Sequence, residues 1–371
     1  MTTPRAIEYL TIKGFKSIKH LEHFPLHDLN VLIGANGSGK SNFISYFRML
    51  GELVEQRLQS WVAKQGGADR VLSFGVKETK YLDSFVLAHN QGYKFSLEPS
   101  VKDQLVFAWE RFYWSYGGLS TNSTWSDLGS GHLESRLLTL TVREDINSKR
   151  IFEDIIGVWK VFHFHDTSDT AGVKRLGSLH DNEYLRQDAA NLAAFLYRLK
   201  LEYPDIYQQI RKTVSLAIPF FDDFVLKPNK LPTEEEQIRL LWRQKDSDYA
   251  LWPSQLSDGS IRFICLVTAL LQPEAPSTII IDEPELGLHP YAITLLGSLL
   301  RSASKRMQVI VSTQSVPLVN EFSLGDLIIV EREQGASVFK RLNPEEFELW
   351  LEEYSTGELW EKNILGGRPQ P

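Results

Sequence analysis

The chain has 371 residues, of which 43% are hydrophobic and 23% charged, and its net charge is −7. This composition is typical of a soluble globular protein, and no apolar run approaches the roughly 20 residues that cross a bilayer. The acidic balance excludes a global attraction to nucleic acid, so DNA binding would need a local basic face. The start has no secretory signal and the single cysteine, Cys265, has no intrachain disulfide partner. We therefore expect a cytoplasmic protein that does not use a membrane.

In chain order, short apolar runs between Ile7 and Ile33 indicate strands. Helical spacing of apolar residues then predicts one helix from Lys40 to Gly66. Residues 70–162 are typical of strands and loops, and residues 182–218 of helices. A strand-like stretch at 238–244 precedes further strands and a hairpin between 307 and 342. Strands that alternate with helices indicate an α/β fold.

The clearest motif is a glycine-rich loop that follows an apolar strand and opens a helix. Its backbone N–H groups can surround a phosphate, Lys40 can reach the β- and γ-phosphates of a nucleotide, and the Ser41 hydroxyl can hold Mg²⁺. An ordinary glycine-rich turn is the alternative. We expect nucleotide contacts from Gly34, Ala35, Asn36, Gly37, Ser38, Gly39, Lys40, Ser41 and Asn42.

Two acids, Asp282 and Glu283, follow a continuous run of isoleucines at 279–281. Such a run suits a strand that is covered on both faces. Beside a phosphate loop, Asp282 would hold Mg²⁺, usually through water, and Glu283 would act as general base on the attacking water. Solvated acids at a strand end are the alternative. The pair favours hydrolysis over transfer of a phosphoryl group to a metabolite.

A second candidate phosphate-binding turn has the sequence LSDGS, at Leu256 to Ser260, and an apolar helix follows it. Ser257 can cap this helix, which we expect to begin near Ser260, and the turn can bind an anion. A plain helix cap with nothing bound is the alternative.

Together, "GANGSGKSN", "LSDGS" and "IIIDEPELGLHP" resemble the head of ABC-type ATPases, in the branch of RecF and the SMC proteins. The resemblance implies a P-loop NTPase with a mixed-sheet lobe and a helical lobe, which uses ATP and Mg²⁺. It also implies a head-to-tail homodimer, in which Ser257 and Gly259 of one copy close over the γ-phosphate held by the other. Gln314 stands at the switch position, where the family often has histidine, and is the third candidate catalytic residue with Lys40 and Glu283.

On this resemblance, residues 1–165 form the N-terminal part of the head with a β-rich insertion, and 166–225 a helical subdomain. Residues 226–343 form the C-terminal part, and 344–371 an appended helix and arm. The family's glutamine loop has no glutamine here, and His165 or Asp166 is the candidate replacement. His163 and His165 could also pair on a metal, although two polar strand-end residues are the simpler interpretation.

The resemblance leaves the output of the ATPase open. A DNA-associated ATPase of repair or genome maintenance is the first hypothesis, and Lys13, Lys16 and Lys19 are the densest early basic group for it. The alternative is an ATP-dependent switch that controls a separate effector protein, as in bacterial phage-defence pairs. A transporter motor fits less well, because the signature of such motors usually ends in Gly-Gly-Gln.

Overall fold

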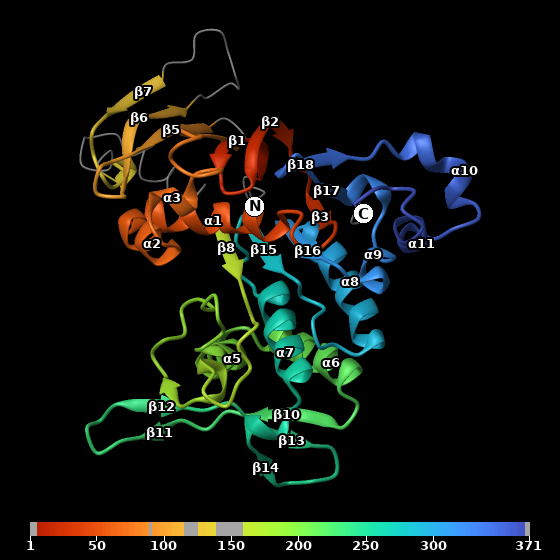
Figure 1. Cartoon of the computed structure of the whole chain (residues 1–371). Helices are drawn as coiled ribbons and strands as arrows, with labels where there is room; N and C mark the ends of the chain where they lie inside the picture. The colour runs from red at the N-terminus through yellow and green to blue at the C-terminus, as the bar shows by residue number, and fades with distance from the viewer. Residues whose placement is uncertain (1–5, 89–90, 115–124, 139–158, 368–371) are drawn as a thin grey trace.

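The computed structural model describes residues 6–88, 91–114, 125–138 and 159–367. Figure 1 shows two sheets above a part that consists of helices and short strands. The first sheet is antiparallel, with six strands in the order β2-β1-β4-β5-β6-β7. Its strands are β1 (Ile7–Phe15), β2 (Ile18–Pro25), β4 (Leu82–Ala88), β5 (Gln91–Pro99), β6 (Leu105–Trp114) and β7 (Trp125–Gly129).

The second sheet has the strand order β18-β17-β3-β16-β15-β8. Five of its strands pair in parallel, and β18 is antiparallel to β17 in the hairpin that the sequence predicts. The carboxyl ends of the parallel strands therefore meet at one edge, where binding sites of open α/β sheets lie. The strands are β3 (Leu29–Ile33), β8 (Trp159–Phe162), β15 (Thr278–Asp282), β16 (Gln308–Thr313), β17 (Leu327–Glu333) and β18 (Ala336–Arg341).

Helix α1 (Lys40–Val54) lies between the two sheets, where Phe43 and Phe47 share one core with Ile280 of β15. The opposite face of the second sheet, with Ile279 and Ile281, packs against the helices below. Both faces of β15 are thus covered, which explains its uninterrupted apolar run. The helices below are α5 (Leu192–Glu202), α6 (Pro204–Ala217), α7 (Asp258–Leu271), α8 (Pro290–Ser304) and α9 (Val316–Val319).

The expected α/β class is confirmed, but two of the expected helices are interrupted. The chain leaves the helix after Val54, passes through Gln56 with φ of 56°, and resumes as α2 (Leu58–Gln65), which ends at left-handed Gly66. The apolar spacing continues across this break because both helices pack against the same core. The second stretch becomes helical only at Leu192, since residues 182–191 form turns and bends. It then breaks where Pro204 begins α6, since proline is favoured at the first helical position and cannot continue a preceding helix.

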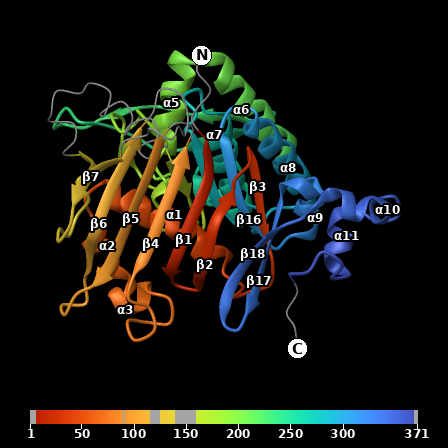
Figure 2. The same cartoon turned by 90° about the horizontal axis from the view of Figure 1, so that it is seen from above.

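The lower part carries two small sheets, and α10 and α11 lie at the side of the molecule opposite β7, as both views show (Figures 1 and 2). Among the residues that the structure describes, no helix is long and apolar enough to cross a membrane. The remaining elements are α3 (Ala68–Val71), β9 (Gly177–Ser178), β10 (Phe221–Val225), β11 (Asn229–Lys230), β12 (Glu236–Ile238), β13 (Leu241–Gln244), β14 (Ala250–Leu251), α10 (Glu348–Leu351) and α11 (Thr356–Glu361).

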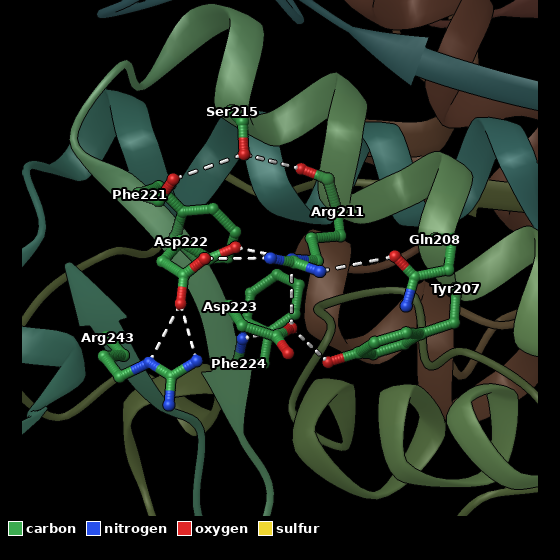
Figure 3. A network of polar contacts seen from close by, with 9 residues as sticks. All are labelled: Tyr207, Gln208, Arg211, Ser215, Phe221, Asp222, Asp223, Phe224 and Arg243. Atoms are coloured by element: carbon green, nitrogen blue, oxygen red, sulfur yellow. Dashed lines mark hydrogen bonds and ion pairs between the residues drawn. The ribbon is translucent and has the colours of Figure 1, made fainter. Parts of the chain in front are cut away.

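An ion-pair network fastens α6 to the sheet of β10 and β13 (Figure 3). The Asp222 carboxylate accepts hydrogen bonds from Arg211 on α6 at 2.8 Å and from Arg243 on β13 at 2.6 and 2.9 Å. The hydrogen bonds from Arg243, then those from Arg211, hold the pKa of Asp222 below its usual value. Since α6 packs against α7, the network supports the helix that begins at the LSDGS turn.

We expect Asp222→Ala to lower the free energy of unfolding by about 1 kcal/mol, because two guanidinium groups lose their shared partner at a partly exposed site. The folded pKa is lowered, so this stabilisation exists above the unfolded value of about 3.9 and disappears as the pH falls below it. Urea unfolding at pH 7 and near pH 3 measures both effects. Asp222 lines a surface hollow together with the exposed residue Asp248, and Asp248→Ala is the control.

Candidate functional site

The phosphate loop connects β3 to α1 and is enclosed by neighbouring backbone. Gly34 has φ of 155°, and a Cβ on it would lie 2.2 Å from the Val330 carbonyl oxygen of β17. Gly39 has φ of 117°, and a Cβ there would lie 1.9 Å from Ser337 Oγ of β18. Any other residue would collide with the β17–β18 hairpin at either position. The loop therefore keeps its backbone open toward the edge of the sheet, as a phosphate ligand requires.

The hydroxyl group of Ser337 also holds the loop through a chain of hydrogen bonds. Ser337 Oγ donates to the Ser38 carbonyl oxygen at 2.5 Å and lies 2.7 Å from Ser17 Oγ, in the turn between β1 and β2. Asn42, one of the expected nucleotide contacts, donates its side-chain amide to Ser17 Oγ at 2.6 Å. The Ser38 hydroxyl is buried and has no hydrogen-bond partner among the described residues. An unsatisfied hydroxyl inside a glycine cradle fits an oligophosphate.

Lys40 is only 5% exposed and donates to the carbonyl oxygens of Gly34 at 2.6 Å and Ala35 at 3.0 Å. Burial lowers its pKa, whereas the negative charges of Glu283, Asp282 and Glu285 oppose that shift. The ammonium group is thus placed between the loop and the acidic strand end. There it can meet the phosphates of a nucleotide.

Asp282 and Glu283 lie at the end of β15, beside the end of the parallel strand β16. Asp282 pairs with Ser312 of β16, whose hydroxyl donates to the Asp282 carboxylate. Glu283 has a left-handed backbone with φ of 42°, and its Oε1 accepts a 2.6 Å hydrogen bond from Gln314 Nε2. The structure therefore brings Glu283, Gln314 and Asp282 together beside Lys40. Ser41 is exposed on the first turn of α1, where its hydroxyl is available to a cation.

Glu285 is a buried site residue that sequence reasoning missed. Its Oε1 accepts from Thr313 Oγ1 at 2.6 Å and from the Gln314 N–H at 3.2 Å. Burial raises its pKa, while these hydrogen bonds lower it. It fastens the loop after Asp282 to the switch strand β16. An acid in a run of loop residues gives no signal of burial, so only the structure reveals this link.

The LSDGS turn lies at the start of α7, which begins at Asp258, slightly earlier than we expected. Ser257 caps it, accepting from the Ser260 N–H at 3.1 Å. A Cβ on Gly259 would lie 2.1 Å from the Gly287 carbonyl oxygen, so the turn packs directly against the loop that follows the acidic pair. The hollow beside Ser257 and the cleft beside the phosphate loop share no lining residue. Ser257 and Gly259 thus line one hollow, whereas Gly37 and Asn42 of the phosphate loop line the other.

Arg262 is a second residue that sequence reasoning missed. It is 6% exposed, and its guanidinium donates to the carbonyl oxygens of Phe164 at 2.9 Å, His165 at 3.3 Å and Leu286. One side chain of α7 therefore joins the loop after β8 to the loop after β15. A single arginine in an apolar helix gave no hint of these partners.

His165 and Asp166, the candidate replacements for the glutamine loop, lie just after β8, and His163 directly follows that strand. Burial, followed by the nearby Arg48 charge, lowers the pKa of His163. The Asp166 carboxylate accepts from Ser168 at 2.7 Å. No group of three or more histidine, cysteine, aspartate or glutamate residues in the described part of the chain could hold a metal ion. The idea of a metal pair at His163 and His165 therefore finds no third ligand there.

A cleft of about 640 Å³ extends from the phosphate loop and was not predicted. Phe74, half exposed, offers an aromatic face there, and Arg332 donates to the Gly37 carbonyl oxygen at 3.3 Å. Lys16, from the expected basic group, lines the cleft too, but its Nζ donates to Ser45 at 2.7 Å and burial lowers its pKa to about 8. Lys13 pairs with Glu22. Lys13 and Lys16 are thus engaged within the chain, whereas Lys19 is exposed near the Phe74 ring.

Fold and site together define a P-loop nucleotide-binding head of the ABC and SMC-like class. A family model described as "AAA domain, putative AbiEii toxin, Type IV TA system" matches residues 29–320. Because the match covers most of the chain, the protein belongs to this family.

The chain is also similar to the DNA replication and repair protein RecF of Nitrosococcus oceani, 42% identical over 45 residues. That alignment spans 12% of each protein. Among solved structures, an SMC head bound to the C-terminal winged-helix domain of ScpA aligns with a TM-score of 0.57 and 16% identity over 92% of this chain and 98% of that chain. A second structure is an SMC head with an extended coiled coil, bound to the C-terminal domain of ScpA derived from Pyrococcus furiosus. It aligns with a TM-score of 0.54 and 16% identity, over 94% of this chain and 99% of that chain. At this identity the structures establish the fold alone.

The raised pKa of Glu285 predicts a pH-dependent stability. Its ionisation opposes folding, so the wild-type protein loses stability as the pH rises from the unfolded value of about 4.3 through the folded pKa. Glutamine keeps an acceptor for Thr313 and Gln314 but carries no charge. We expect Glu285→Gln to raise the Tm by about 2 °C at pH 8, with the difference vanishing near pH 4. Exposed Glu346→Gln is the control, and an equal gain there would remove the burial argument.

Proposed function

We propose that this protein hydrolyses ATP with Mg²⁺ at the carboxyl edge of the second sheet. The observation that carries the proposal is the convergence of Lys40, Asp282 and the Glu283–Gln314 pair from the adjacent strands β3, β15 and β16. A phosphate cradle, a buried cation and two acids in this order match the needs of phosphoryl chemistry in P-loop proteins. Family membership supports it, because AAA and SMC-type heads are ATPases in general.

In the reaction, an oxygen of water attacks the γ-phosphorus and the bond to the β–γ bridging oxygen breaks, giving ADP and phosphate. Glu283 takes the proton from the attacking water, and Gln314, which contacts it at 2.6 Å, holds the carboxylate in place. Lys40 stabilises the charge on the phosphate oxygens. Mg²⁺, which Ser41 and Asp282 would hold, would further neutralise the triphosphate.

We also propose that the complete site needs two copies of the chain. The supporting observation is that Ser257 and Gly259 line a different hollow from the phosphate loop, although both turns suit an anion. In a head-to-tail dimer with two-fold symmetry, each turn meets the phosphate loop of the partner. Gly259 rests on Gly287, so closure at the turn is mechanically linked to the loop that follows Glu283.

For the output, the short similarity to RecF supports an association with DNA in repair or genome maintenance. The family description, which names a putative toxin of a type IV toxin–antitoxin system, supports the second candidate. In that case the ATP-bound dimer regulates a separate protein or acts as one half of a two-protein system. The two candidates share the ATPase and differ in the partner.

Single-residue variants test the chemistry. Lys40→Ala should lose nucleotide binding, because the triphosphate loses its buried cation. Glu283→Gln should still bind ATP and keep the contact with Gln314, but hydrolyse ATP about 10²-fold or more slowly, because an amide cannot take the proton. Nucleotide titration and phosphate release measure the two properties. Turnover of Glu283→Gln at the wild-type rate would exclude the general-base role.

A mixing experiment tests the composite site. Ser257→Arg should bind ATP but not hydrolyse it, because the bulky cation blocks the partner's γ-phosphate. In a mixture with Lys40→Ala, half of the dimers are mixed and have one intact site. About a quarter of wild-type activity should then return if the sites act independently. Normal hydrolysis by Ser257→Arg, at a specific rate independent of protein concentration, would show that one chain is sufficient.

DNA binding is tested by association with single- and double-stranded DNA, with and without ATP. If DNA is the partner, contacts to phosphates should make the affinity fall steeply between about 50 and 200 mM salt. Stimulation of the ATPase by DNA at low salt would favour this candidate. No association at low salt, in either nucleotide state, would exclude it and leave the protein partner.

A further inference from the structure

The C-terminal segment Thr356–Gly367, here called the strap, connects the switch region to the phosphate loop. Its helix α11 packs on α9, which begins directly after Gln314 and Ser315. The Gly357 N–H donates to Asn320 Oδ1 at 2.7 Å, and a Cβ on Gly357 would lie 2.6 Å from that oxygen. The strap is anchored by side chains that lie within the lower core, namely Leu359, Trp360 and Leu365.

Beyond Leu365 the strap reaches the first residue of the phosphate loop. Gly366 and Gly367 both have φ of 83°, a left-handed conformation that favours glycine. A Cβ on Gly367 would lie 3.4 Å from Gly34 Cα and 3.2 Å from Ile329 Cγ2. A methyl group at Gly367 would therefore be in van der Waals contact with Gly34, so the end of the strap lies beside the first residue of the phosphate loop. Gly34 also lies close to the Val330 carbonyl oxygen, so two segments of the chain neighbour it.

One side chain holds this end of the strap. Glu331 Oε1 accepts a 2.9 Å hydrogen bond from the Gly367 N–H, and Glu331 Oε2 forms a 3.0 Å ion pair with Lys340. The Gly367 N–H, followed by Lys340, holds the pKa of Glu331 below its usual value. The bond is thus charge-assisted, which makes it stronger than one between neutral groups. Within the described part of the chain, Glu331 forms no hydrogen bond with Glu283 or Gln314.

We propose that the strap, held through the Glu331–Gly367 hydrogen bond, is a positioning element that keeps Gly34 and the phosphate loop in the conformation that binds nucleotide. The inference rests on the proposed ATPase function. If only a fraction of the molecules has a competent loop, the apparent dissociation constant rises in inverse proportion to that fraction. No hydrogen bond between described residues joins the strap to Glu283 or Gln314, so we expect its loss to affect binding rather than the chemical step.

Four variants separate this role from general support of the fold. Glu331→Ala removes the acceptor, and Gly367→Ala adds a Cβ against Gly34. Glu331→Gln keeps an acceptor oxygen for the Gly367 N–H but loses the ion pair with Lys340. Lys340→Met removes the same ion pair and keeps the hydrogen bond. The last two are the matched controls, because they change the charge without releasing the strap.

We expect Glu331→Ala and Gly367→Ala to raise both the Kd for ATP and the KM about fivefold to tenfold, with kcat within about twofold of wild type. Glu331→Gln and Lys340→Met should stay within about twofold in all three constants. Coupling is reciprocal. ATP binding should therefore slow amide hydrogen exchange at Ile364–Gly367 in the wild-type protein, and much less in Glu331→Ala.

Three results would contradict the proposed positioning role of the strap. They are an unchanged Kd in Glu331→Ala, equal effects of Glu331→Ala and Glu331→Gln, or a fall in kcat with constant KM. If Glu331→Ala does not fold, hydrogen exchange in the wild-type protein tests the proposal instead. An exchange rate at Ile364–Gly367 that does not change when ATP binds would contradict it. Wild-type protein that neither binds nor hydrolyses ATP would instead overturn the proposed function and the strap with it.

Discussion

Close packing of backbone against backbone around the phosphate loop is the constraint on which the rest of the site depends. The loop has little side-chain bulk of its own, so its shape is imposed by Val330 and Ser337 of the β17–β18 hairpin. Both contacts exclude a Cβ, and both come from strands that follow the loop by almost 300 residues. The site is therefore a property of the whole head, although the motif itself is local.

At the same edge, burial and charge act against each other. Desolvation disfavours the ammonium of Lys40, and the neighbouring carboxylates favour it. Glu285 is the reverse case, since burial favours its neutral form. A polyanion entering this edge would change both balances, because it supplies charge to Lys40 and repels the acids. The ionisation of Lys40 and of Glu285 is thus set by burial and by neighbouring groups that oppose its effect.

The sequence was sufficient for features with local causes. The phosphate loop, the covered strand before Asp282, the β17–β18 hairpin and the cap at Ser257 each follow from residues close to one another in the chain. It was not sufficient where the cause is a long-range contact. The break at Gln56 is hidden because one core covers both helices, and the start of α7 lies at Asp258 rather than near Ser260. Arg262, Glu285 and the cleft beside Phe74 have partners that no pattern in the chain announces.

The order of the second sheet also has a consequence for synthesis. Strand β3 is buried throughout and apolar apart from Asn30, and its two neighbours, β16 and β17, are among the last strands to be made. Until the ribosome has delivered them, β3 has two open edges and no sheet to join. Long-range strand pairing of this kind is slow, and hydrophobic surface and unpaired strand edges stay exposed until it is complete. During synthesis, the strand that carries the phosphate loop is therefore the one that waits longest for its neighbours, so the loop takes its final shape only when nearly the whole chain has been made.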